Sequence, residues 1–117
     1  MSMRRTYALL VAGTAVLATL ATITPSTAAP SCEARAICLW TEQNGGGQLK
    51  VWRGGYLDLP SNFHHHVYSF RANRSGAFIN YHDGTKQCRT VSAGNFADNY
   101  NKGAAFGKTM DAIGDNC

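Results

Sequence analysis

Beyond residue 30, apolar and polar positions alternate in short runs, and none has the spacing of about 3.6 residues that marks an amphipathic helix. β-branched and aromatic residues are frequent in these runs, which predicts short strands. Glycine and Asx residues separate the runs, as in "NGGG" and "DGT", and suit turns that need a positive φ. The sequence predicts an all-β sandwich with strands near residues 36–40, 48–52, 66–72, 77–81, 88–92 and 109–113.

The predicted strands form two similar halves. "VWRGGYLDL" (residues 51–59) aligns with "VSAGNFADN" (residues 91–99) at an offset of 40. A four-stranded unit cannot bury its apolar face alone, so we expect repeat one (about 36–74) to pack on repeat two (about 76–117) as one domain. The matched pairs are Val51 with Val91, Gly54 with Gly94, Tyr56 with Phe96, Asp58 with Asp98 and, within one residue of this offset, Trp40 with Tyr81 and Gly45 with Gly84.

These repeats resemble the βγ-crystallin Greek-key domain. The segments "CLWTEQNGGG" and "VYSFRANRSGAFINY" are more specifically similar to the secreted bacterial peptidase inhibitor family I36, relatives of the Streptomyces metalloproteinase inhibitor. The resemblance implies a βγ-crystallin-like sandwich of two Greek-key motifs and covers nearly all of residues 29–117. It carries less information about activity, because function depends on sites that vary within one fold.

The N-terminal segment has the features of an export signal. Arg4 and Arg5 precede an apolar stretch (residues 7–23), and Pro25 and small residues follow it. We expect cleavage after Ala28, a signal peptide over residues 1–28 and a secreted, extracellular domain over residues 29–117. A membrane anchor is the alternative, but no positive stop-transfer cluster follows. We therefore expect no membrane association after cleavage.

All four cysteines lie in the predicted mature domain, at positions 32, 38, 88 and 117. An even number in a small secreted domain indicates two disulfides, and four cysteines allow three pairings. We favour Cys32–Cys38, which would fix the new N-terminus, and Cys88–Cys117, which would fix the C-terminus.

Composition argues against several functions. The 11 Lys and Arg residues include Arg4 and Arg5 in the leader, and the remaining basic residues are spread singly, so we expect no nucleic acid partner. No GxSxG, HExxH or phosphate-binding loop occurs, and we predict that the protein is not an enzyme. We expect a monomer.

The βγ-crystallin resemblance also implies a calcium frame, N/D-N/D-x-x-S/T-S, in each repeat. With Ser69 as the last residue of the frame, His64 and His65 occupy its first two positions. In repeat two, Met110 and Asp111 would come first and Gly114 and Asp115 last. Only Ser69 and Asp111 keep the oxygen chemistry that calcium needs, so both sites are predicted to be degenerate.

The run His64-His65-His66 raises the question of a nitrogen site for zinc or copper. Consecutive residues of a strand point to opposite faces, so only His64 and His66 would share one. A structural zinc site needs four ligands, and the position of His82, the fourth histidine, is not fixed by the sequence. We therefore predict a solvated turn, with no metal site and no cofactor.

The aromatic residues are expected to form most of the core. Val51 and Trp52 are neighbours in an alternating strand, so one of them must face outward, and an exposed Trp52 would suit a partner contact. The expected core aromatics are Trp40, Trp52, Tyr56, Phe63, Tyr68, Phe70, Phe78 and Tyr81.

The leading functional hypothesis is a secreted peptidase inhibitor with a peptidase as its partner. Its candidate inhibitory loop contains Lys86, Gln87, Cys88 and Arg89, and residues 99–107 form a second candidate. Cys88 has no second cysteine a few residues further on, unlike the disulfide-closed loop of the family, so no reactive residue is assigned by the resemblance. The alternatives are a βγ-crystallin-type binding or structural module with weak or lost calcium binding, and a toxin-like antimicrobial.

Overall fold

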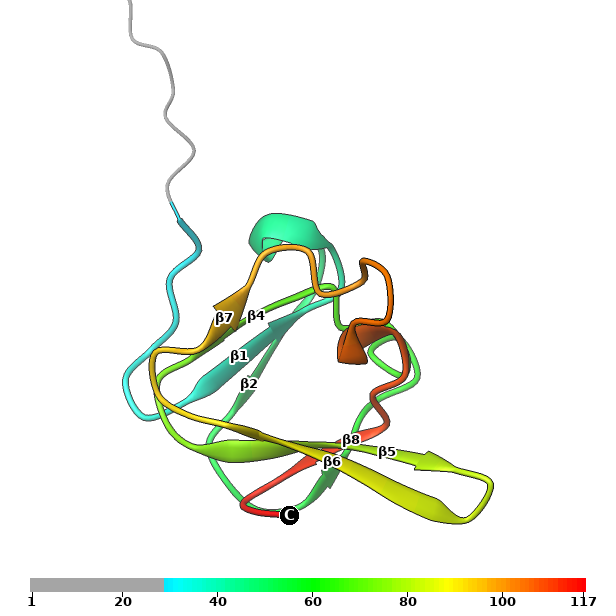
Figure 1. The fold of residues 1–117 in the computed structure, drawn as a ribbon. Coiled ribbons are helices and arrows are strands. Elements are labelled where there is room, and N and C mark those ends of the chain that lie inside the picture. Colours follow the sequence, from blue (N-terminus) through cyan, green and yellow to red (C-terminus); the bar gives the residue numbers. More distant parts are fainter. Residues whose placement is uncertain (1–28) are drawn as a thin grey trace, which may run out of the picture.

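The computed structural model describes residues 29–117, so the predicted signal peptide lies outside the described residues. Two four-stranded antiparallel sheets pack face to face (Figure 1). All six predicted segments contain a strand, and the predicted all-β fold is confirmed. Among the described residues, no helix is long and apolar enough to cross a membrane. One sheet has the order β2 (Leu49–Trp52), β1 (Ile37–Trp40), β4 (Ser69–Ala72), β7 (Phe96–Ala97), and the other β3 (Leu57–Asp58), β8 (Ala112–Gly114), β5 (Gly76–His82), β6 (Thr85–Val91).

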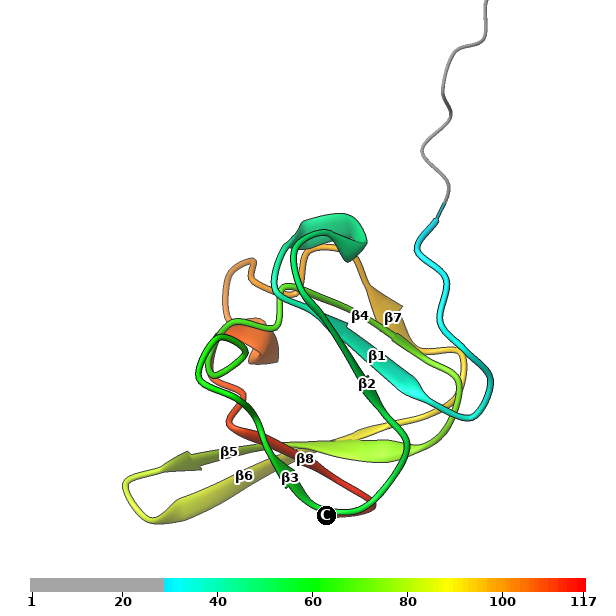
Figure 2. The ribbon, with the colours of Figure 1, turned by 180° about the vertical axis from the view of Figure 1, so that it is seen from behind.

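The two repeats exchange one short strand each. β3 belongs to repeat one in sequence, yet it pairs with β8 of repeat two, with Leu57 opposite Ile113. β7 belongs to repeat two and pairs with β4 of repeat one, with Phe70 opposite Ala97. Figure 2 shows β3 beside β8 at the edge of the second sheet. Each sheet is therefore completed by the other repeat.

The strand registers define which residues of the repeats are equivalent. The exchanged strands match at the predicted offset of 40, since Phe70 pairs with Ala97 as Ile113 pairs with Leu57. Leu39 is opposite Phe70 and Phe78 is opposite Ile113, so Leu39 is equivalent to Phe78 and Phe70 to Ile113.

Two of the predicted repeat matches need correction. Ile37 is opposite Trp52 and Gly76 is opposite Val91, so Val91 is equivalent to Trp52 and not to Val51. Trp40 is equivalent to Ile79 and not to Tyr81, because Trp40 is opposite Ser69 as Ile79 is opposite Ala112. Both errors arise because the repeats are not related by one constant offset. Their connecting loops differ in length, so the offset changes from one strand to the next.

The first hairpin of each repeat has a different shape. In repeat one the β1–β2 connection folds back through a short 3-10 turn, η2 (Gln43–Gly45), onto β4. The buried Ser69 hydroxyl holds it by donating to the Glu42 carbonyl (2.7 Å) and accepting the Gly45 N–H (2.9 Å). In repeat two the equivalent position is Ala112, which has no hydroxyl. The β5–β6 hairpin instead stays extended to Asp83 and Gly84 and projects from the domain (Figure 1).

The core lies between the sheets and contains residues of both repeats. A second 3-10 turn, η3 (Phe106–Lys108), places the Phe106 ring in it. Gly107 is buried there, and a Cβ on it would lie 1.9 Å from the Val67 carbonyl oxygen, so only glycine fits. The buried cluster consists of Ile37, Leu39, Trp52, Leu59, Phe63, Val67, Phe70, Ala72, Phe78, Val91, Phe106, Met110 and Ile113.

Three aromatic residues differ from the expectation or resolve it. Trp52 is 2% exposed, and its indole N–H donates to the Gly55 carbonyl (2.8 Å), so it is no partner contact and Val51 is the outward residue. Tyr56 and Tyr81 were predicted to lie in the core but are 58% and 47% exposed. They lie on the outer side of the second sheet, because the alternation in β5 buries Phe78 and turns Tyr81 outward.

Two disulfides stabilise the domain, with the favoured pairing of Cys32 to Cys38 and Cys88 to Cys117. The first bridge joins the N-terminal segment to β1, and the second joins β6 to the C-terminus. Their sequence separations are 6 and 29 residues. In the chain-entropy model these loops contribute about 2.4 and about 3.6 kcal/mol to folding, a large share for so small a domain.

We predict that Ser69→Ala lowers the free energy of unfolding by about 1–3 kcal/mol, because it leaves the Gly45 N–H and the Glu42 carbonyl without their buried partner. Urea denaturation measures the change. Ser92→Ala, at an exposed position, is the matched control and should change stability by less than about 0.5 kcal/mol. Equal effects of the two substitutions would contradict the role assigned to Ser69.

Candidate functional site

The three consecutive histidines lie at the end of a turn between β3 and β4, over residues 61–65. The Phe63 and His64 N–H groups both donate to the Pro60 carbonyl, at 2.8 and 3.1 Å. His65 has a φ of 61°, in the left-handed region that non-glycine residues rarely adopt, and its N–H donates to the Met110 carbonyl (2.9 Å). The backbone therefore reverses here and does not alternate as a strand does.

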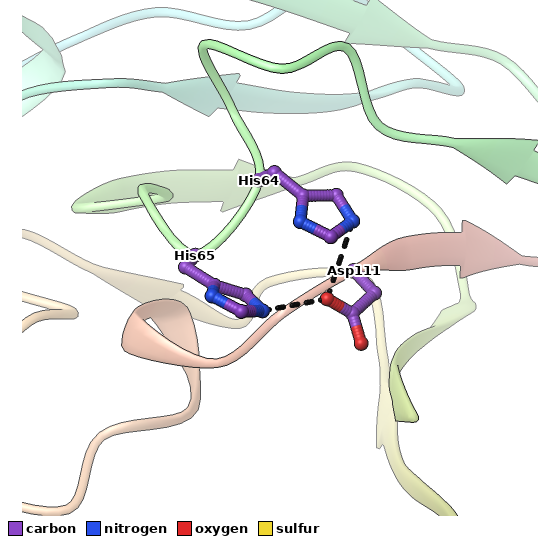
Figure 3. Close-up of side chains that lie close together, drawn as sticks. All are labelled: His64, His65 and Asp111. Carbon is purple, nitrogen blue, oxygen red and sulfur yellow. Dashed lines mark hydrogen bonds and ion pairs between the residues drawn. The ribbon is translucent and has the colours of Figure 1, made fainter. Parts of the chain in front are cut away.

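This turn brings two imidazole rings to one carboxylate (Figure 3). The Nε2 atom of His65 lies 2.7 Å from Oδ1 of Asp111, and Nε2 of His64 lies 3.3 Å from the same oxygen. The prediction that His64 and His65 point to opposite faces is wrong, because it assumed strand geometry where the chain turns. The three ligand atoms all lie within 4.8 Å of one another.

Asp111 is a buried carboxylate, 6% exposed, just before β8. Its Oδ2 atom accepts the Tyr81 backbone N–H (2.7 Å), which leaves Oδ1 facing the imidazole rings. A buried carboxylate is costly unless it is hydrogen-bonded or paired with a cation. The Tyr81 N–H and the two imidazoles supply those interactions. The site is therefore held in place on the Asp111 side and is open to solvent on the histidine side.

The other two histidines do not join this cluster. The His66 ring stacks on Tyr68 with centroids 3.9 Å apart, and its Nε2 lies 3.8 Å from Glu42. His82 lies near the tip of the β5–β6 hairpin, where its ring is 3.3 Å from Asp83. Both are available as internal controls for any effect of the cluster.

The calcium frame assigned to repeat two is displaced by three residues. Ser69 is equivalent to Ala112, so the frame ends at Ala112 and not at Asp115. Asp115 has another role, since it accepts hydrogen bonds from the Gly55 N–H and from Arg74 (both 3.1 Å). The first two frame positions of repeat two become Gly107 and Lys108, whose side chains offer no oxygen.

The Asp111–His65 contact could not be found from the sequence spacing, because 46 residues separate the two. It depends on the exchanged strand β3. The Leu59 N–H, just after β3, donates to the Asp111 carbonyl (3.0 Å) and so aligns the histidine turn with the start of β8. A prediction that β3 pairs with β8 would have placed the histidine turn beside Asp111.

The predicted inhibitory loop is a strand. All four residues, Lys86, Gln87, Cys88 and Arg89, lie in β6, which is one of the two edge strands of its sheet. Its side chains are exposed apart from the half-buried Cys88 and the buried Val91. Lys86 donates to the Cys117 carbonyl (3.1 Å), and the Cys88–Cys117 disulfide links the middle of the strand to the C-terminus.

The second candidate, residues 99–107, is only partly a surface loop. Phe106 and Gly107 at its end are buried, and Lys108 donates back to the Gly103 carbonyl (3.0 Å). Substitutions near its end would disturb the core. β6 is therefore the better candidate for partner contact.

A tyrosine pair adjoins the cluster through Tyr81. The Tyr56 and Tyr81 hydroxyls are 3.2 Å apart, and the Tyr56 hydroxyl donates to Asp58 (3.0 Å). The hydrogen bond with Tyr81, desolvation and the Asp58 carboxylate raise the pKa of the Tyr56 phenol well above its usual range. Tyr56 acts as the hydrogen-bond donor to Asp58.

Comparison with known proteins gives both a relative and a fold. An uncharacterized gerABC family protein from Dictyostelium discoideum is 31% identical over 91 residues, covering 75% of this chain and 78% of the relative. No family model matches the chain.

Among solved structures, a βγ-crystallin from Ciona intestinalis aligns with a TM-score of 0.54 and 14% identity, over 69% of this chain and 99% of the crystallin. IPSE/alpha-1 from Schistosoma mansoni eggs aligns with a TM-score of 0.49 and 14% identity, over 68% of this chain and 82% of that protein. The domain has the βγ-crystallin fold. At this identity the likeness establishes the fold alone.

We predict that calcium gives no resolvable rise in the melting temperature at neutral pH, because His64, His65, Gly107 and Lys108 offer no side-chain carboxylate or amide oxygen at the frame positions. A ligand at a hundred times its Kd would add about 2.7 kcal/mol of stability. At about 4–8 °C per kcal/mol for a domain of this size, thermal denaturation followed by circular dichroism would detect such binding. A rise of that size in millimolar calcium would contradict the degenerate-frame interpretation.

Proposed function

The chain belongs to the gerABC family, and we propose that it is an extracellular binding protein that inhibits a secreted peptidase through strand β6. Support for an extracellular location comes from its two disulfides, which persist in oxidising compartments.

The observation that best supports this proposal is that β6 is a long edge strand with one uncovered side. It pairs with β5 over all seven of its residues, Thr85–Val91, and no strand of residues 29–117 covers its other edge. Peptides often bind by adding a strand to such an edge, with main-chain hydrogen bonds giving affinity and alternate side chains giving specificity. An exposed edge of this length is otherwise a liability, which a protein must cover or use.

The chain around β6 is held rigid before any partner binds. Asn80 of β5 donates from its side chain to the Gln87 side chain (2.8 Å), and the Arg89 guanidinium lies 5.0 Å from the centre of the Phe106 ring. The Cys88–Cys117 disulfide fixes the middle of the strand. Rigidity lowers the entropic cost of binding and retains the segment in the cleft of an enzyme, which is what a slowly released inhibitor needs.

The resemblance to family I36 agrees with this role but assigns no reactive bond in β6. The chemistry of the strand gives a narrower expectation. Lys86 and Arg89 flank Gln87 and Cys88 and lie on opposite faces of the strand, so β6 presents one cation on each face and little apolar surface. A cleft that accepts basic or polar side chains fits it better than one that selects large apolar residues.

We predict stoichiometric, slowly reversible inhibition of at least one enzyme in a panel of secreted metallo- and serine peptidases. Lys86→Ala and Gln87→Ala should each raise the inhibition constant at least about tenfold, as expected of hot-spot residues that contact the enzyme. Lys86→Ala should keep its melting temperature because the Lys86 side chain is exposed, whereas Gln87→Ala should lower it because the buried Asn80 amide loses its acceptor.

The matched control is Lys50→Ala in β2, which is one of the two edge strands of the other sheet. It should leave inhibition unchanged. Rapid digestion of the native protein by every enzyme in the panel would contradict the proposal, as would an equal loss of inhibition in the Lys50 and Lys86 variants.

A further inference from the structure

We propose that His64, His65 and Asp111 bind a divalent transition metal ion, of the class that includes zinc, nickel and copper. The three side chains supply two imidazole nitrogens and one carboxylate oxygen at a single point on the surface (Figure 3). None of the three residues lies in strand β6, so metal binding and the inhibitory role can be tested separately.

The donor set selects the class of metal. Imidazole nitrogen suits zinc, copper and nickel, whereas calcium takes six to eight oxygen ligands. Zinc sites with three protein ligands of the His and carboxylate type leave a further position for water or another ligand. The histidines occupy positions of a calcium frame, but the cluster that they form favours a transition metal over calcium.

The three donor atoms lie within 4.8 Å of one another, and the two separations from Asp111 Oδ1 are close to those that a bound ion requires. Metal–ligand bonds of about 2.0–2.2 Å in a tetrahedral site place neighbouring donor atoms about 3.3 Å apart. His64 Nε2 already lies 3.3 Å from Asp111 Oδ1, and His65 Nε2, at 2.7 Å, is too close by about half an ångström. A small rotation of the His65 ring would replace its hydrogen bond to Asp111 by a shared metal ion.

The backbone holds the ligands in place before the metal arrives. The Tyr81 N–H fixes Oδ2 of Asp111 and leaves Oδ1 free to coordinate. His65 has a positive φ, and its N–H donates to the Met110 carbonyl. Together these features fix the chain reversal that points both rings toward Asp111. Strained backbone of this kind is found most often at functional sites, and hydrogen bonds to ligand side chains raise metal affinity.

The site is open to solvent on the histidine side. The side chains of His64 and His65 are 44% and 57% exposed, whereas that of Asp111 is 8% exposed. An ion can therefore enter without unfolding the domain, and its remaining positions face outward, toward water or a ligand from a partner. The metal joins a turn of repeat one to the start of β8 in repeat two, so it should bind the folded state only and stabilise it.

Isothermal titration of untagged, EDTA-treated protein with zinc, nickel and calcium chloride tests the proposal. One equivalent of zinc or nickel should bind, with calcium far weaker, and zinc should raise the melting temperature. His64→Ala and His65→Ala should each lower zinc affinity at least about tenfold. Loss of a residue that only hydrogen-bonds a ligand already lowers metal affinity about 10- to 100-fold. His66→Ala and His82→Ala are the matched controls and should leave affinity unchanged.

Asp111→Asn keeps an oxygen for the Tyr81 N–H and removes the charge, so it should weaken zinc binding as well. Because Asp111 is buried, cobalt absorption in the folded wild-type protein supplies a second measurement, with an intense visible band expected from a low-coordinate site containing nitrogen ligands. Failure of the wild-type protein to bind zinc would overturn the proposal. Zinc binding that survives the His64→Ala, His65→Ala double substitution, or that is lost in His66→Ala, would overturn it too.

Discussion

The exchange of β3 and β7 between the repeats is the constraint on which the rest of the structure depends. A two-residue strand has almost no stability of its own, and it persists here because the sheet of the other repeat receives it. Leu57 and Ala97, on these strands, pack against the common core. Neither repeat can therefore complete its sheet or bury its apolar face alone, and the two fold as one unit.

The same exchange creates the histidine–carboxylate cluster. β3 carries the chain of repeat one to β8, and the turn that follows must return from there to β4. His64 and His65 lie in that return turn, directly beside the residue that precedes β8. In a fold without the exchange, the histidine turn and Asp111 would belong to separate sheets.

The two repeats also show how one position can change the use of a hairpin. Ser69 holds the hairpin of repeat one against β4, and this covers the end of that sheet. Ala112 at the equivalent position cannot form these bonds, and the β5–β6 hairpin, closed by the short turn at Asp83 and Gly84, projects with its edge strand exposed. The repeats share a fold, but the hairpin of repeat one folds back onto β4, whereas the hairpin of repeat two projects from the domain.

Much of the fold could be predicted from the sequence. Strands with several β-branched or aromatic residues gave a clear pattern, and the disulfides followed from the positions of the cysteines. β3 and β7 gave no such pattern, because only tertiary pairing makes their two residues strands. Tyr56 and Tyr81 were misplaced because aromatic type does not reveal which face of a sheet a residue occupies.

The candidate site was the harder part. The residues could be identified, but His65 adopts a positive φ, which is uncommon for any non-glycine residue, and without that turn the two rings would diverge. Likewise, the position of the Asp111 carboxylate depends on contacts distant in sequence. It accepts a hydrogen bond from the Tyr81 N–H and lies against His65 of the other repeat. Local sequence encodes which groups are present, whereas strand exchange decides which of them meet.

Diffraction data collected at the zinc absorption edge, from crystals of the protein soaked in zinc, test most directly whether the exchanged strands build a metal site. The structure predicts an anomalous peak about 2.0–2.2 Å from Nε2 of His64, Nε2 of His65 and Oδ1 of Asp111. Both imidazoles still hydrogen-bonded to an unchanged Asp111, with anomalous peaks only elsewhere, such as at His82, would contradict this assignment.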